Sequence, residues 1–302
     1  MSGSIFSEDQ LRRHDLDDLK RFLRLKLGGY GVVIRDLGAN TFYRGVVCPE
    51  RPETVGRISY PPAQFVTSLG RVNRIGRPVF YCSCGAPSVF FELRAKAGDL
   101  IALSTWSLAE PLWMHHLGYH EDSMRRLGAP TSAMRSSMIR PIPGETPENA
   151  RMRRQLSLAF TKDVRPGQEH LYKQSIVIHE LLFDRAEPLK THPDGPRFDR
   201  AAGTAYPALQ MRGAADNVAL WPEFVDSSLR LRRVLYVRVE AADPASSSYS
   251  LLTVGISREF PDGHLVWQER LPPEGERRSH IDFIDGAWIM RDGAGRVYDR
   301  HF

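Results

Sequence analysis

The chain has 302 residues, 42% hydrophobic and 25% charged, a composition typical of a globular protein large enough for one or two domains. Its 41 basic and 36 acidic residues are interspersed and give a formal net charge of +5, which indicates no nucleic-acid binding and is enough for a small anionic ligand. Three cysteines without metal-ligand spacing, a start without a signal-peptide pattern and no apolar run of membrane-spanning length predict a cytoplasmic protein that binds no metal or membrane.

The N-terminal part is predicted to consist of one helix and two strands. Ser7 and Gln10 have the spacing of a capping box, and apolar residues then recur at helical intervals until the Gly-Gly pair that begins at Gly28. Two runs rich in β-branched and aromatic residues follow at 32–35 and 41–48, with turn residues between them. This pattern predicts two strands.

A basic loop punctuated by glycines occupies 70–77, and it precedes a predicted strand at 78–83. Guanidinium groups on such a loop can hold a pyrophosphate, because each presents a planar fork of hydrogen-bond donors. A helix is expected next, since Pro87 suits its first turn and Gly98 its end. Another strand is predicted at 100–105.

The second half of the chain combines weakly patterned stretches with a few definite elements. Only short helices and loops are expected from 108 to 150, whereas an apolar stripe predicts a helix at 169–185. A loop rich in Pro, Asp and Gly is expected at 188–203, and clean alternation predicts a strand at 231–240. Shorter strands are predicted after a small-residue linker, at 251–256, 264–268, 287–291 and 296–301.

One carboxylate and two arginines are the main candidates for chemistry. Glu92 follows the basic loop, where a carboxylate can stabilise a developing positive charge. The alternative for Glu92 is a surface ion pair with Lys96 four residues later, worth about 0.2–0.5 kcal/mol. Arg44 and Arg71 are suited to bind phosphate groups. Their alternatives are a strand-edge arginine paired with a carboxylate for Arg44 and a solvated loop charge for Arg71.

Aromatic and histidine side chains provide further candidates. Tyr81, and with less support Tyr43, can border a flat polar heterocycle, and the alternative is a half-buried strand tyrosine that packs on the core. Three histidines, His115, His116 and His120, lie close together in the sequence, and the last two are four residues apart, which is a spacing for metal ligands. The glutamate of the HExxH motif is absent and Gly118 weakens a helix there, so we expect a solvated or locally hydrogen-bonded histidine cluster.

Separated blocks of sequence carry a resemblance to a known family. They are FYRG at 42–45, GRVNRIGRPVFY at 70–81, FFELR at 90–94, GTAYPALQ at 203–210 and DNVAL at 216–220. Over roughly 41–240 the chain resembles the RES domain family, named for its Arg, Glu and Ser residues. The blocks in this order are far more specific than any one alone. Ala208 departs from the family pattern, which has serine after Tyr-Pro, and the candidates to replace that hydroxyl are Ser83 and Thr204.

The resemblance implies an α+β fold with an ADP-ribosyltransferase-like core of two packed, mainly antiparallel sheets and surrounding helices. Residues 1–40 are then a helical and strand lead-in, 41–240 the RES-like domain and 241–302 a C-terminal antiparallel β extension. Members of the family consume NAD as a substrate and are commonly toxins, each neutralised by a small helix-turn-helix antitoxin. The acceptor is phosphate, water or a protein in different members. Assembly of the chain into a homo-oligomer stays an open alternative.

The resemblance also implies roles for individual residues. Glu92 and Arg44 are expected to be catalytic, with the Glu92 carboxylate holding a ribose hydroxyl as nicotinamide leaves. The residues expected to bind NAD are Arg71, Tyr81, Tyr43, Asn73 and Tyr206. The expected function is cleavage of the nicotinamide–ribose bond, as a glycohydrolase or phosphorylase. The alternatives are a catalytically weakened protein that binds NAD or ADP-ribose, because of Ala208, and a protein-interaction module built around the C-terminal strands.

Overall fold

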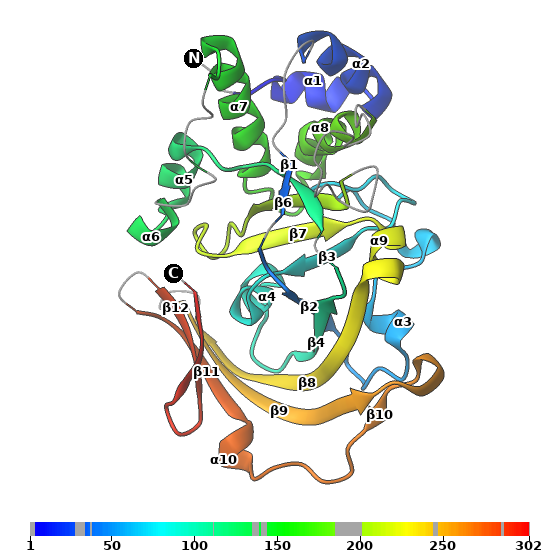
Figure 1. Ribbon diagram of the computed structural model, residues 1–302, viewed down its shortest axis with the longest axis vertical. Helices are drawn as coiled ribbons and strands as arrows, with labels where there is room; N and C mark the ends of the chain where they lie inside the picture. Colours follow the sequence, from blue (N-terminus) through cyan, green and yellow to red (C-terminus); the bar gives the residue numbers. More distant parts are fainter. Residues whose placement is uncertain are drawn as a thin grey trace.

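The computed structural model describes residues 4–27, 34–36, 38–110, 112–134, 139, 144–184, 201–243, 247–284 and 287–301. A large, mostly antiparallel sheet runs through the molecule, and α1, α2, α7 and α8 gather at one end of it (Figure 1). The α+β class expected from the sequence is therefore confirmed. Within the part of the chain that is described, no helix is both long and apolar enough to cross a membrane.

The described residues form helices of four to fourteen residues and strands of two to fifteen. The helices are α1 (Glu8–Arg13), α2 (Leu16–Lys26), α3 (Val55–Ile58), α4 (Ala86–Glu92), α5 (Glu121–Leu127), α6 (Thr131–Met134), α7 (Pro147–Phe160), α8 (Tyr172–Asp184), α9 (Pro222–Ser228) and α10 (Glu274–Arg277). The strands are β1 (Ile34–Asp36), β2 (Thr41–Val47), β3 (Phe80–Ser83), β4 (Leu100–Leu108), β5 (Trp113–His116), β6 (Gly203–Pro207), β7 (Asp216–Leu220), β8 (Leu229–Asp243), β9 (Ser248–Glu259), β10 (Val266–Trp267), β11 (Arg278–Ile284), β12 (Ala287–Asp292) and β13 (Val297–His301).

The strands are hydrogen-bonded in the order β1-β5-β6-β7-β3-β2-β4-β8-β9-β11-β12-β13, with β10 paired to β9. Among these pairs only β5 and β6 run parallel. A narrow junction divides the sheet, because β2 and β3 share one register pair, Tyr43 with Ser83, while β2 pairs with β4 along its whole length. Where two packed sheets were expected, the structure thus has two halves of one sheet. Because strands twist, the two halves of the sheet can diverge on either side of the single register pair between β2 and β3.

The N-terminal segment forms two helices where one was expected. Ser7 and Gln10 make the predicted capping box, in which each side-chain oxygen accepts the backbone N–H of the other residue. α1 ends at Arg13, because Asp15 starts a new helix by accepting the N–H of Asp18. A helix-length run of apolar residues therefore contains a second cap that divides it.

The helices at this end share one core. Leu19, Leu23 and Leu27 are fully buried in a cluster that also contains residues of α7 and α8. Burial of each leucine stabilises the fold by about 1.5–3 kcal/mol. Phe22 of the predicted stripe is instead 47% exposed. The helix predicted at 169–185 is confirmed as a short 3₁₀ turn followed by α8.

Helix α4 packs on β2 at Gly45, where an added Cβ would collide with the side chains of Val89 and Leu93. The helix ends at Glu92, although it was expected to reach Gly98. The backbone N–H of Arg94 bonds to Phe91 and that of the next residue bonds back to Phe90, a left-handed helix end with φ 49° at Arg94. Because glycine usually occupies this position, the stop is hidden in the sequence.

Four of the described strands, β5, β6, β7 and β11, were not predicted from the sequence. β5 lies within 108–150, where only short helices and loops were expected, and β11 lies before the strand predicted at 287–291. β5 carries the sequence WMHH, which does not alternate, and its stability comes from pairing with β1 and β6. β8 continues to Asp243, and β9 pairs with it, so the strands of 241–302 continue the same sheet.

Some expectations concern residues that the structure does not describe. The helix stop at Gly28 and Gly29, the first residues of the strand predicted at 32–35 and the loop predicted at 188–203 as far as residue 200 lie outside the described residues.

Candidate active site

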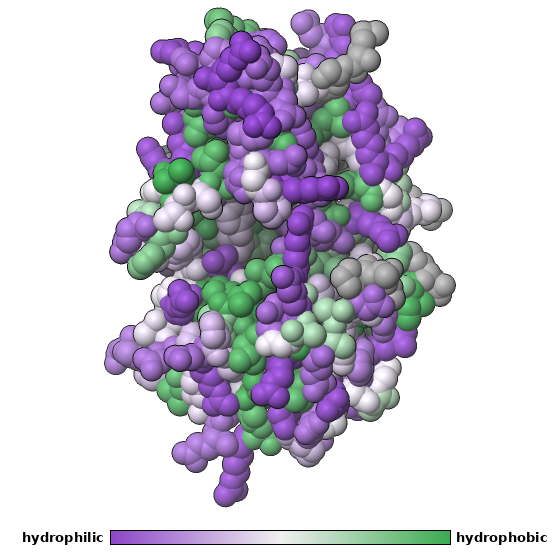
Figure 2. Space-filling model, turned by 180° about the vertical axis from the view of Figure 1, so that it is seen from behind, coloured by the Kyte–Doolittle hydropathy of each residue, from purple (hydrophilic) through white to green (hydrophobic). Residues whose placement is uncertain are grey.

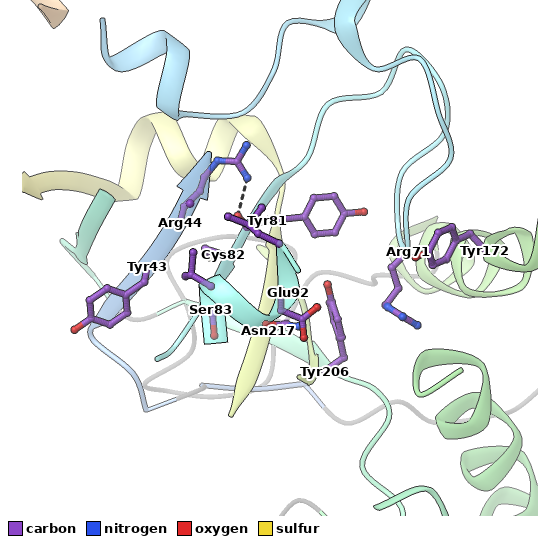
Figure 3. A pocket seen from close by; sticks show the side chains of 13 residues that line it. Tyr43, Arg44, Arg71, Tyr81, Cys82, Ser83, Glu92, Tyr172, Tyr206 and Asn217 are labelled. Atoms are coloured by element: carbon purple, nitrogen blue, oxygen red, sulfur yellow. Dashed lines mark hydrogen bonds between the residues drawn. The ribbon is translucent and has the colours of Figure 1, made fainter. Parts of the chain in front are cut away.

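A cavity of ≈ 300 Å³ opens where the two halves of the sheet separate (Figure 3). Its walls come from β2, β3, β6, β7, α4, the basic loop at 70–77 and the first turn of α8. The lining residues are Tyr43, Arg44, Gly45, Arg71, Tyr81, Cys82, Ser83, Val89, Glu92, Leu93, Tyr172, Tyr206 and Asn217. The structure thus brings together every residue expected at the site except Asn73.

Glu92 is the last residue of α4, and its side chain lies between Asn217 and Tyr206 (Figure 3). The residue is exposed to solvent, although many protein atoms lie around its carboxyl group. This desolvation raises its pKa, and hydrogen bonding by Asn217 and the charge of Arg71 offset part of the rise. Lys96 lies beyond the helix end, so the alternative of an i,i+4 helix pair does not apply.

Arg71 stands at one end of the cavity, held by the end of α7. Its Nη1 donates to the carbonyl oxygen of Phe160 at 2.7 Å and its Nη2 to that of Lys162 at 3.2 Å. A helix C-terminus favours a cation, because its last carbonyl groups lack partners in the helix. The guanidinium carbon also lies 5.5 Å from the ring centroid of Tyr172 and 5.6 Å from that of Tyr206. Arg71 is therefore a fixed positive charge between two aromatic rings.

Tyr81 connects the cavity wall to the basic loop. Its hydroxyl donates to Asn73 Oδ1 at 2.8 Å and accepts from the Val72 N–H at 3.0 Å, and burial raises its pKa. Asn73 is 7% exposed and lies behind Tyr81, so its contact is with the loop and not with the cavity. At Gly70 an added Cβ would collide with Asn73. Gly70 and Asn73 thus shape the loop that carries Arg71.

Arg44 lines the cavity but directs its guanidinium toward the main chain (Figure 3). Nη1 donates to the Tyr81 carbonyl oxygen at 2.8 Å, and Nε donates to those of Ile58 and Ser59 at 3.2 and 3.1 Å. Burial lowers the pKa of Arg44 to about 10. Backbone carbonyl groups therefore take the place of the carboxylate considered as its partner. They tie β2 to β3 and to the turn after α3.

Aromatic rings form much of the remaining wall. Tyr206 is 5% exposed, and burial raises its pKa well above the usual range. Tyr43 lies at the opposite end of the cavity from Arg71 (Figure 3). Tyr172 stands beside Arg71 on the first turn of α8. The cavity consequently has several aromatic rings around a single lining carboxylate, with a cation at one end.

Asn217 and Tyr172 line the cavity but were not among the residues expected to bind or react, and Ser83, which also lines it, was considered only as a replacement for the family serine. The sequence did contain a signal for Asn217, because this residue belongs to DNVAL, one of the ordered blocks that carry the family resemblance. Ser83 Oγ donates to the Asp216 carbonyl oxygen at 3.0 Å, and it accepts a hydrogen bond from the Ser88 hydroxyl. No sequence pattern indicated that Tyr172 would face this cavity.

Ala208 is fully buried among apolar side chains next to α4 and does not line the cavity. Its lack of a hydroxyl therefore removes no group from the cavity wall. Thr204 is also fully buried, and its hydroxyl lies 2.7 Å from His179 Nδ1. Of the two candidates to replace the family serine, only Ser83 reaches the cavity.

The three histidines considered as metal ligands lie on different elements of the fold and have different roles there. His115 and His116 lie on β5, whereas His120 caps α5 through its ring nitrogen, which accepts the Asp122 N–H at 3.2 Å. Within the described ranges, no cluster of three or more His, Cys, Asp or Glu side chains is placed to hold a metal ion. Burial raises the pKa of the Cys82 thiol, so this cavity residue is a poor nucleophile.

The arrangement can bind a flat ring against tyrosines, a phosphate against Arg71 and a positive charge against Glu92. None of the family models, curated proteins or solved structures compared with the chain matches it.

Proposed function

We propose that the protein consumes NAD by cleaving the bond between nicotinamide and ribose. The observation that supports this most is the convergence of Glu92, Arg71 and tyrosine rings on one cavity from five separate segments of the chain. The ordered blocks that resemble the RES domain family supply these residues, with the exception of Tyr172.

In the proposed reaction the nicotinamide nitrogen leaves with the bonding electron pair, and the ribose becomes an oxocarbenium ion. The Glu92 carboxylate stabilises this cation and holds a ribose hydroxyl. When the bound substrate excludes water from the cavity, a preorganised charge of this kind contributes about 3–4 kcal/mol. Water or phosphate then forms the new bond at the ribose carbon and releases a proton if it is water. Arg44 keeps the β2 and β3 walls together during these steps.

The test measures release of nicotinamide from NAD by chromatography. Glu92→Gln keeps the shape of the side chain and removes its charge, so we expect a loss of about 10²–10³-fold in kcat. Glu276→Gln changes an exposed carboxylate on α10 and serves as the matched control, with an unchanged rate. Equal rates for wild type and Glu92→Gln would contradict the proposal.

A second candidate is a protein that binds NAD or ADP-ribose without cleaving it. The observation that favours it is that Arg44, one of the two residues expected to be catalytic, directs its guanidinium to main-chain carbonyl groups. Of the two, Glu92 then remains as the group that faces the cavity. Titration calorimetry separates the two candidates. Saturable binding of NAD with no nicotinamide released supports the second.

A further inference from the structure

A second cavity, of ≈ 360 Å³, adjoins the first. Arg71, Glu92 and Tyr172 line both cavities, so the two meet at these side chains. The second cavity continues between the segment after α4 and the segment that links α7 to α8. A ligand that passes Arg71 would therefore enter it.

The size of the first cavity calls for such a continuation. Sites for small molecules usually measure about 300–1,000 Å³, and the first cavity of ≈ 300 Å³ is at the lower limit. A dinucleotide contains two nucleosides joined by a pyrophosphate, and a space at this limit suits one of them. The two cavities together offer room for both, with Arg71 at their boundary.

Charged side chains of both signs line the second cavity beyond the shared residues, namely Arg94, Arg165, Asp163 and Glu169. Arg94 lies in the left-handed region with φ 49° and pairs with Asp163 at 3.1 Å. A non-glycine residue held in this conformation is strained, and such strain is often found at ligand sites. The Arg165 side chain is exposed and has no hydrogen bond or ion pair with the described residues. It is thus available for an anionic group.

Part of the lining of the second cavity is apolar. Leu69, Val164 and Pro166 contribute to its lining, and the half-buried ring of Tyr172 forms the shared wall. A purine requires such flat, apolar surfaces, while the carboxylate of Asp163 suits a ribose hydroxyl. These properties match an adenosine with phosphate attached.

From these observations we infer that the second cavity binds the adenosine diphosphate half of a dinucleotide. The order along the two cavities is then nicotinamide near Tyr43, ribose at Glu92, pyrophosphate at Arg71 and adenosine beside Arg165. The inference rests on the proposed function for the nicotinamide end only. Binding of a nucleoside diphosphate to the second cavity does not depend on cleavage.

The experiment measures binding of ADP by titration calorimetry to wild type, Arg165→Ala and Arg13→Ala. Arg13 is an exposed arginine of α1 and controls for the change in net charge. We expect ADP to bind wild type and Arg13→Ala alike and Arg165→Ala about tenfold more weakly, the effect of one lost charge-assisted hydrogen bond. Absence of ADP binding at millimolar concentration, or equal binding by all three proteins, overturns the inference.

Release of nicotinamide from NAD and from nicotinamide mononucleotide separates this inference from the proposed function. We expect kcat/KM to be higher for NAD, and the preference to fall about tenfold in Arg165→Ala. Equal kcat/KM values for the two substrates would leave cleavage established and overturn the assignment of the second cavity. ADP binding that depends on Arg165, with no nicotinamide released, would support the second cavity and contradict the proposed function.

Discussion

Two regions of the molecule hold titratable groups with shifted pKa values, and they differ in access. At the sheet junction, Glu92 faces a cavity that opens to solvent, with Arg71 and Asn217 beside it. On β5 and α8, His115 and His179 are only 2% and 1% exposed. Burial lowers the pKa of His115 to about 4 and that of His179 to about 3.

The histidine region is closed by aromatic rings. The ring of His179 lies 5.0 Å from that of Trp221, and the ring of His115 lies 5.1 Å from that of Phe183. Both ring nitrogens of His115 and Nε2 of His179 have no hydrogen-bond partner among the described residues. The comparison teaches that a shifted pKa alone reports burial. Access to solvent and an opposing charge are what distinguish the candidate site.

The largest expected effect is the response of the histidine region to acid. The folded state holds both imidazoles neutral, so between the unfolded pKa of 6.5 and the folded values the unfolded chain binds more protons. Stability therefore falls as the pH falls through this range, by about 2 kcal/mol for each histidine at pH 5. Urea unfolding at pH 7, 6 and 5 measures the loss.

His179→Gln sharpens this test, because it removes one titrating group and retains a side chain able to bond to Thr204. The slope of unfolding free energy against pH should fall by about half. An unchanged slope would show that the histidine region does not control the acid response. It would contradict the distinction between histidines whose pKa is lowered by burial and the solvent-accessible Glu92 at the cavity.

A smaller effect is expected from Tyr81→Phe in the cavity wall. The hydroxyl of Tyr81 has two partners in the basic loop, and its removal leaves Asn73 Oδ1 and the Val72 N–H without it. A buried polar group that loses its partner costs about 1–3 kcal/mol. Thermal unfolding measures this cost, and Tyr60→Phe is the control, because the Tyr60 hydroxyl bonds to Asp226 at an exposed position. Equal destabilisation by the two variants would indicate that Tyr81 does not anchor the loop.

The smallest effect, and the only stabilising one, is expected from Arg94→Gly. Glycine adopts the left-handed conformation without the cost of about 1–2 kcal/mol that other residues bear. The lost ion pair with Asp163 is exposed and worth about 0–1 kcal/mol. The midpoint of thermal unfolding should therefore rise slightly, while binding of ADP weakens. A lower midpoint would mean that Arg94 stabilises the helix end beyond its backbone conformation.

The sequence led to much of the candidate site through short ordered blocks. Arg71 and Glu92 are near each other in the chain, and their chemistry was legible from residue type and context. Asn217 and Tyr172 were not found, because nothing in a strand or helix pattern states which distant segment its side chains will face. Asn73 was placed at the site, yet it supports Tyr81 from behind, a difference that depends on which face of the loop is buried.

The parts of the fold that could be predicted are those that depend on local sequence patterns. The capping box at Ser7 and the alternation of β8 were readable, because caps and periodicity depend on neighbouring residues. The second cap at Asp15, the end of α4 at Glu92 and strand β5 were not. The first depends on a competition between two caps, the second on an arginine in a conformation that glycine usually adopts, and the third on pairing with a strand far along the chain.

By itself, therefore, the sequence determined the α+β class, the main helices and strands and the residue types available for chemistry, since these follow from composition and local periodicity. Only the tertiary structure decided that β2 and β3 meet at a single pair and leave a cavity between the diverging halves of the sheet. That outcome depends on hydrogen bonds and packing between segments far apart in the chain, and no local pattern records them.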